Sequence, residues 1–194
     1  MQADFAVELG ADDETLEVPW AAEDGGPRYH DLKRHPELLS KLEEVAQAPE
    51  LGEFLSKVNS PQSPLETAKC DVWSSTEMNP EEEIFEAAQK FGSYVDLFFS
   101  DEAKRFSFPQ HEQLAKQLTK LLHRVPDMAV AAEFLIRRCY YHEQKEVPGE
   151  EEIRDGFYIT FYLFGYGDDE ARSRQNWVIG LKLVQNAIRQ LSAK

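Results

Sequence analysis

The residues most capable of chemistry lie in two strand-like segments in the second half of the chain. Asp96 interrupts the apolar sequence FGSYVDLFFS, and Thr160 interrupts GFYITFYLFGY. A carboxylate within an apolar strand must be solvated or paired, because burying it alone would shift its pKa towards the neutral form. Arg137 or Arg138 in a neighbouring segment would supply the opposite charge. Such an ion pair serves structure more often than catalysis.

Strand alternation predicts an aromatic and polar face on these segments, opposite an aliphatic face. Only one of the two adjacent arginines can lie on that face, and the sequence leaves the choice open. A large aromatic surface with a few polar groups is typical of an interface or a ligand groove. The candidate ligand-binding residues are Trp73, Tyr94, Asp96, Arg137, Arg138, Tyr158, Thr160 and Tyr162.

Three different covers could lie over this aromatic face. The helices expected within residues 36–58 would give a three-layer core. A second copy of the chain would give a homodimer with the same patch on both subunits. A small molecule or a protein partner would make the face a binding groove.

The sequence contains no recognisable catalytic or metal-binding motif. The phosphate-binding loop, GxGxxG and GxSxG patterns are absent. His111-Glu112 lacks the second histidine of a zincin motif because Ala115 occupies that position. Cys139 and His142 would point to opposite faces of a strand and could not share a metal. We therefore expect no metal and no cofactor, and an enzymatic role is less favoured than binding.

Four strands and two long helices are expected to position the candidate residues. Residues 131–142 could be strand or helix, and their β-branched and aromatic content favours a strand. Residues 143–155 form an acidic loop by composition, and residues 81–89 a short helical or turn-like piece. The expected strands are Ala68–Glu77, Phe91–Ser100, Glu133–His142 and Gly156–Tyr166, and the expected helices are Pro109–Val125 and Asp168–Leu191.

The order of these elements suggests an internal duplication of a strand–strand–helix unit, in residues 68–125 and 131–191. The alternative is that the two stretches are unrelated and look alike only because strands favour the same residue types. The duplication predicts an α+β fold with an antiparallel four-stranded sheet and the two long helices on one face.

Three regions follow from composition along the chain. Residues 1–27 hold eight acids and no base, and form an acidic arm that is either two short strands or a tail. Residues 28–64 contain a small helical hairpin followed by a linker rich in proline and serine. Residues 65–194 form the two-layer α+β core.

The charge balance narrows the classes of partner. The 194 residues include 36 acids and 21 bases, a net charge of -15, which disfavours nucleic acid and anionic membranes. The two expected core helices are basic, however, and could form a local strip of positive charge, so the net charge excludes nucleic acid less firmly than it first suggests. Two distant cysteines suit a reducing compartment, and no apolar run is long enough to span a membrane. We expect a cytoplasmic protein.

The leading functional hypothesis is a non-catalytic binding or interaction protein, expected as a homodimer, that works through its aromatic sheet face. An inhibitor or immunity-type protein that docks its acidic segments on a basic partner is a second hypothesis. An enzyme that uses Asp96, an arginine and the tyrosines is the third.

Overall fold

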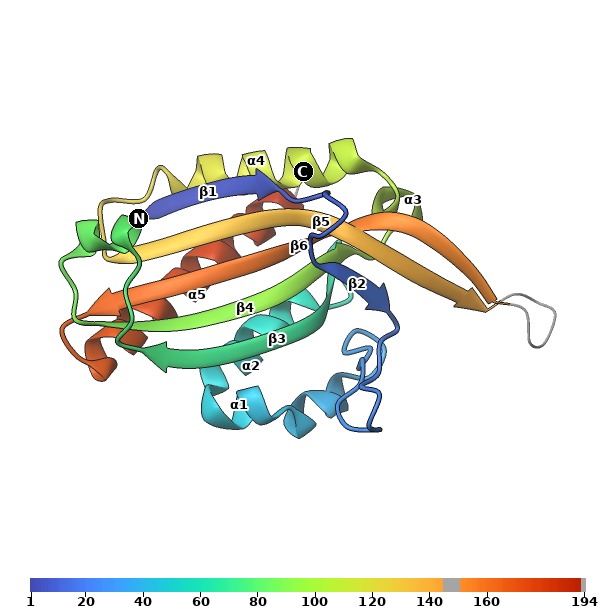
Figure 1. Cartoon of the computed structure of the whole chain (residues 1–194), viewed down its shortest axis with the longest axis horizontal. Coiled ribbons are helices and arrows are strands. Elements are labelled where there is room, and N and C mark those ends of the chain that lie inside the picture. Colours follow the sequence, from blue (N-terminus) through green and yellow to red (C-terminus); the bar gives the residue numbers. More distant parts are fainter. Residues whose placement is uncertain (145–150, 193–194) are drawn as a thin grey trace.

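The computed structural model describes residues 1–144 and 151–192, and its centre is a twisted mixed sheet (Figure 1). The strand order is β1–β5–β6–β4–β3, and β2 also pairs with β5. The bounds are β1 Gln2–Val7, β2 Thr15–Val18, β3 Leu65–Ser75, β4 Gln89–Phe99, β5 Val130–Gln144 and β6 Glu151–Gly167. The expected α+β class is confirmed, and residues 131–142 are strand.

The sheet differs from the antiparallel four-stranded sheet expected. Strands β3, β4, β6 and β5 are antiparallel neighbours, but β1 and β2 add to the outer side of β5 in parallel. Without them β5 would be an edge strand with unpaired backbone groups. The acidic arm supplies those partners, and the Glu8 amide continues the pairing by donating to the Ile136 carbonyl at 2.9 Å. The prediction of four strands is therefore wrong because a distant segment completes the sheet.

Helices α2 (Pro49–Val58), α4 (Phe108–Leu122) and α5 (Glu170–Ser192) lie behind the sheet in Figure 1, on its aliphatic face. Helices η1 (Pro36–Lys41) and α1 (Glu43–Gln47) lie below β3 in this view, at the edge of the sheet. Helix α2 shares this face with α4 and α5, since the Phe54 ring contacts the Phe161 ring at 5.8 Å. Residues 36–58 therefore do not cover the aromatic face, and the expected alternative of a three-layer core is wrong.

Helix α5 approaches β6 so closely that a glycine is required between them. A Cβ on Gly165 would lie 2.2 Å from the Trp177 backbone nitrogen. Trp177 is fully buried there, and its indole Nε1 donates to Ser93 Oγ at 2.9 Å. The close approach fixes the longest helix against the centre of the sheet.

Polar contacts attach the segment before the core to the sheet. The Asn59 amide donates to the Leu55 carbonyl and to Thr67 Oγ1, and its oxygen accepts from the Thr67 amide. The Lys33 ammonium donates to the carbonyls of Ser63 and Leu65 and to the Ser100 hydroxyl. Both ends of this segment are thereby tied to β3.

Strands β5 and β6 continue beyond the rest of the sheet as a projecting hairpin (Figure 1). The described residues of the region expected as a loop, 143–144 and 151–155, are strand, because they extend the antiparallel pairing of β5 and β6. Its remaining part, residues 145–150, lies outside the described residues. Two short helices complete the fold, η2 (Pro80–Phe85) and α3 (Glu102–Arg105).

The strand–strand–helix order occurs twice, as β3–β4–α4 and β5–β6–α5, while the duplication itself stays a prediction. In the part of the chain that is described, no helix is long and apolar enough to cross a membrane.

Candidate functional site

The sheet face opposite the helices is covered at its two ends and open between them. At one end, Leu16 and Val18 of β2 pack with Trp20 and Tyr29 over a cluster of open-face side chains. That cluster consists of Phe98, Cys139, Tyr141 and Tyr158. The acidic arm is thus the cover at this end, which none of the three expected covers included.

Helix η2 covers the opposite end of the same face. Its Phe85 ring stacks on the Tyr166 ring with centroids 4.1 Å apart. Its Glu82 carboxylate accepts from the Lys90 ammonium at 2.7 Å and from the Tyr166 hydroxyl at 2.9 Å. An aromatic stack and a shielded ion pair therefore hold η2 on the sheet.

Between the two covers the floor is made of half-buried aromatic rings. Tyr94 and Tyr162 pair at 5.9 Å, and Trp73 meets Phe164 edge to face at 5.9 Å. Gly92 lies between Trp73 and Phe164 in the register, and a Cβ there would lie 2.8 Å from the indole ring. The glycine therefore allows the two rings to touch, so that the floor is continuous across β3, β4 and β6.

A groove of about 730 Å³ adjoins this floor beside η2, on the side of β1 and β5, and shares Tyr162 and Phe164 with it. This size is within the range of small-molecule and peptide pockets. Its lining includes Tyr162, Phe164 and Tyr166 of β6, Glu133 and Leu135 of β5, Asp4 of β1, and Ile84 and Phe85 of η2. Apolar rings form the base of the groove, and carboxylates form part of its wall.

The carboxylates of the groove repel one another. Asp4 lies directly beside Glu133 in the register of β1 and β5, and Glu81 of η2 lines the same groove. Partial burial raises the pKa of Glu133, and the nearby Glu8 and Asp4 raise it further. The groove therefore holds its negative charge at some cost in free energy, which a positive ligand would relieve.

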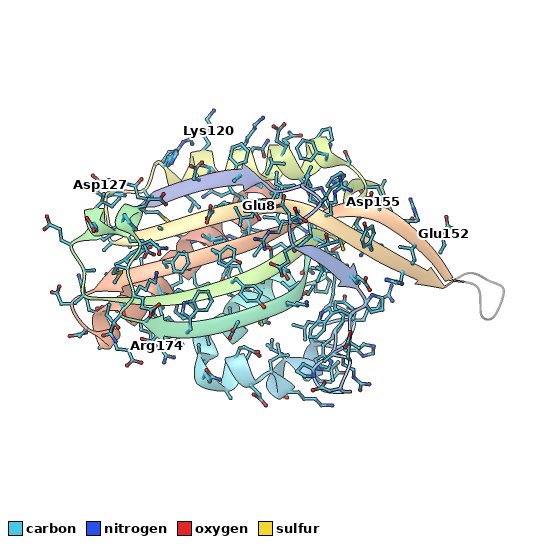
Figure 2. The ribbon with its side chains drawn as sticks, viewed as in Figure 1. Glu8, Lys120, Asp127, Glu152, Asp155 and Arg174 are labelled. Carbon is cyan, nitrogen blue, oxygen red and sulfur yellow. The ribbon has the colours of Figure 1, made fainter. Side chains whose placement is uncertain are left out.

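A line of buried polar groups borders the other side of the open floor. Arg137 donates to Glu8 at 2.7 Å, to Glu14 at 2.8 Å and to Thr160 Oγ1 at 3.2 Å, and Thr160 donates to Asp96 at 2.8 Å. Figure 2 labels Glu8 near the end of β1, where the chain turns towards β2. These hydrogen bonds therefore attach the part of the arm between β1 and β2 to the sheet.

Burial raises the pKa of Asp96 to about 7. The Thr160 hydrogen bond and the charges of Lys69 and Arg137 lower it, but Glu14 acts in the opposite direction and burial dominates. Asp96 is only 3% exposed, so a dissolved substrate cannot reach it without movement of the surrounding chain.

The structure divides the predicted site residues into three groups. Trp73, Tyr94 and Tyr162 form the open floor, whereas Asp96, Thr160, Arg137 and Tyr158 are buried beside it or beneath the arm. The register settles the choice between the two arginines, because Arg137 faces the open side opposite Tyr158. Arg138 points to the other face, where its guanidinium lies 4.0 Å from the Asp155 carboxylate.

Several residues of the groove were missed from the sequence. Phe164 and Tyr166 lie two and four residues after Tyr162, so strand alternation places them on the same face and could have identified them. Asp4 and Phe85 come from segments whose position depends on long-range pairing, which no local pattern shows.

No metal site or activated thiol accompanies the groove in the described residues. They contain no cluster of histidine, cysteine and acidic side chains able to hold a metal. Cys70 and Cys139 are free thiols, and burial raises the pKa of each to about 12. Both are therefore protonated at neutral pH and poor nucleophiles.

Comparison with protein-family models, with curated proteins and with solved structures finds no significant match. The function is therefore argued from the geometry and charge of the groove.

Proposed function

We propose that the protein is a non-catalytic binding protein whose ligand lies in the groove on the open sheet face. The observation that carries the proposal is the half-buried floor of Trp73, Tyr94, Tyr162 and Phe164, left open between two covered ends. The chain covers similar rings elsewhere on this face with its own segments. A large aromatic surface that stays open is characteristic of a binding site.

The placement of the polar groups favours binding over catalysis. A general acid or base must come within hydrogen-bond reach of the substrate. Asp96 and Thr160 are buried and bonded to each other, and Arg137 is already bonded to Glu8 and Glu14. These groups support the proposal as parts of the scaffold that shapes one border of the groove.

A fragment screen by NMR tests this proposal. Uncharged aromatic fragments and small amines are added to the full chain, and the ring resonances of Tyr94 and Tyr162 are followed. We expect fragments to shift these resonances, and Tyr162→Ala to abolish the effect. Tyr140→Ala is the matched control, because Tyr140 is also half-buried but lies on the opposite face of the β5–β6 hairpin.

Two results would contradict the proposal. The groove is not a binding site if no fragment shifts the two tyrosines, or if the two variants lower fragment binding equally. Sedimentation of the same samples tests the homodimer separately. A dimer that is lost in Tyr162→Ala would mean that a second copy of the chain covers the floor.

A further inference from the structure

Where the chain covers this face near η2, it places a cation over an aromatic ring and an acid beside the cation. The Lys90 ammonium lies 5.5 Å from the Phe164 ring centroid and 2.7 Å from a Glu82 carboxylate oxygen. An ammonium over a ring gains from the negative charge of the ring face, and more so where water is partly excluded.

The same arrangement occurs under the other cover. The Arg105 guanidinium lies 4.9 Å from the Phe98 ring centroid and 5.4 Å from that of Tyr141. Its Nη2 atom is 3.5 Å from a Glu66 carboxylate oxygen. Both covers of this face thus combine a ring, a cation and an acid.

In the described residues, the Tyr94–Tyr162 part of the floor has rings and acids but no cation over its rings, unlike Phe164, which lies under Lys90. In the register, Asp71 lies beside Tyr94, and Glu133 lies beside Tyr162. Among the described residues, no ammonium or guanidinium lies over either tyrosine ring. Arg137, the cation nearest to Tyr162 along the strands, hydrogen-bonds the Tyr162 side chain and two carboxylates of the arm, and does not lie over the ring.

On the basis of the proposed function, we infer that the groove and the adjoining Tyr94–Tyr162 part of the floor bind a basic segment of another protein. A lysine or arginine of that segment lies over the Tyr94–Tyr162 pair, with Glu133 and Asp71 as acceptors for its charge. The bound cation completes the set of groups that the chain itself supplies under both covers.

The size and charge of the groove favour a protein segment over a single free amine. A volume of about 730 Å³ is much larger than one ammonium group, and the acids extend from β1, β5 and η2 in the groove to Asp71 of β3 on the adjoining floor. The net charge of -15 would also steer a basic partner towards the protein and raise the association rate. The repulsion of Glu133 by its acidic neighbours would be relieved on binding.

Calorimetry with the full chain and a short peptide of alternating lysine and serine tests the inference. The matched peptide carries acetyl-lysine, which keeps the length and removes the charge. We expect the lysine peptide to bind and the acetylated peptide to bind at least about ten-fold more weakly. Glu133→Gln and Asp71→Asn should each weaken binding of the lysine peptide about five-fold.

Glu53→Gln is the control variant, since it removes the same charge from an exposed position on α2, in the helix layer. It should change the affinity less than about two-fold, because separated surface charges are screened by salt. Equal losses in Glu133→Gln and Glu53→Gln would mean general attraction to an acidic protein and would overturn the inference. Equal binding of the two peptides would also overturn it.

The remaining outcomes separate this inference from the proposed function. If the lysine peptide fails to bind while uncharged fragments still shift Tyr94 and Tyr162, the groove binds a different ligand class and only the inference is wrong. If neither binds, the proposed function fails as well. A dimer that occludes the groove would assign the floor to a second copy and would also overturn the inference.

Discussion

The helix-bearing face and the open face of the sheet belong to the same strands but are covered by different interactions. On the helix side, Val95, Phe134 and Phe161 are fully buried against α2, α4 and α5. On the open side, ion pairs add to the apolar contacts of the two covers: Arg137 bonds Glu8 and Glu14 of the arm, and Lys90 bonds Glu82 of η2.

Because of this difference, pH and salt should affect the two faces unequally. Apolar burial on the helix side varies little with pH or salt near neutrality. The covers of the open side combine apolar contacts with ion pairs, and salt and pH can weaken the ion pairs. The open face is therefore the part of the molecule that solution conditions and partners can change.

The largest expected effect tests the helix side. Phe161→Ala should lower the free energy of unfolding by about 3–5 kcal/mol, because the Phe161 ring packs between Phe54 and Phe134 without exposure to water. Phe164→Ala, on the same strand but on the open face, should cost only about 1–2 kcal/mol because that ring is half-buried. Urea unfolding followed by circular dichroism measures both. Equal losses would remove the distinction between the faces.

Asp96 is expected to make stability depend on pH. Its pKa is raised in the folded state from 3.8 to about 7 by burial, so the folded state holds the proton more tightly than the unfolded state. Its stabilising contribution is therefore present below 3.8 and is lost as the pH rises through about 7. We expect the free energy of unfolding to fall by about 2 kcal/mol between roughly pH 5 and 8 from this group.

Asp96→Asn should remove this slope, because an amide oxygen can still accept the Thr160 hydrogen bond and carries no charge. Urea titrations at several pH values measure the slope in both proteins. An unchanged slope in the variant would show that other groups cause it.

Arg137→Met should loosen the arm with a smaller loss of stability. Breaking a buried ion pair can cost several kcal/mol, but the side chains of Glu8 and Glu14 are 36% and 59% exposed and can regain water. We therefore expect a loss of about 1–2 kcal/mol and faster hydrogen exchange in β2. Arg138→Met, on the other face and exposed, should change neither. Unaltered exchange in β2 would mean that the apolar cluster alone holds the arm.

The smallest effect concerns the groove. Glu133→Gln should stabilise the free protein by about 0.3 kcal/mol, because it removes repulsion from Asp4 and Glu8. The melting temperatures of Glu133→Gln, Glu53→Gln and the unmodified protein measure this difference, with Glu53→Gln as the control. A destabilised Glu133→Gln would show that the carboxylate supports the fold and is not held at a cost for a ligand.

Local pattern was enough to predict most of the elements and the side on which their residues lie. The alternation of Tyr94, Asp96, Tyr158, Thr160 and Tyr162 predicted a shared face, and the structure confirms that face. It could not predict which of these side chains are accessible. Accessibility depends on the arm, whose few apolar residues carry no sign that they pair with a strand more than a hundred residues away.

The amino-acid sequence by itself determined the α+β class, the aliphatic and aromatic sides of the strands, and the concentration of acids in the arm, because periodicity and composition are local properties. Only the tertiary structure decided that Arg137 joins Thr160 and Asp96, that the arm buries Tyr158, and that Asp4 and Phe85 border one groove. These outcomes depend on strand register and on pairing between distant segments. Both are set by the sum of many weak contacts, and no short stretch of residues contains that sum.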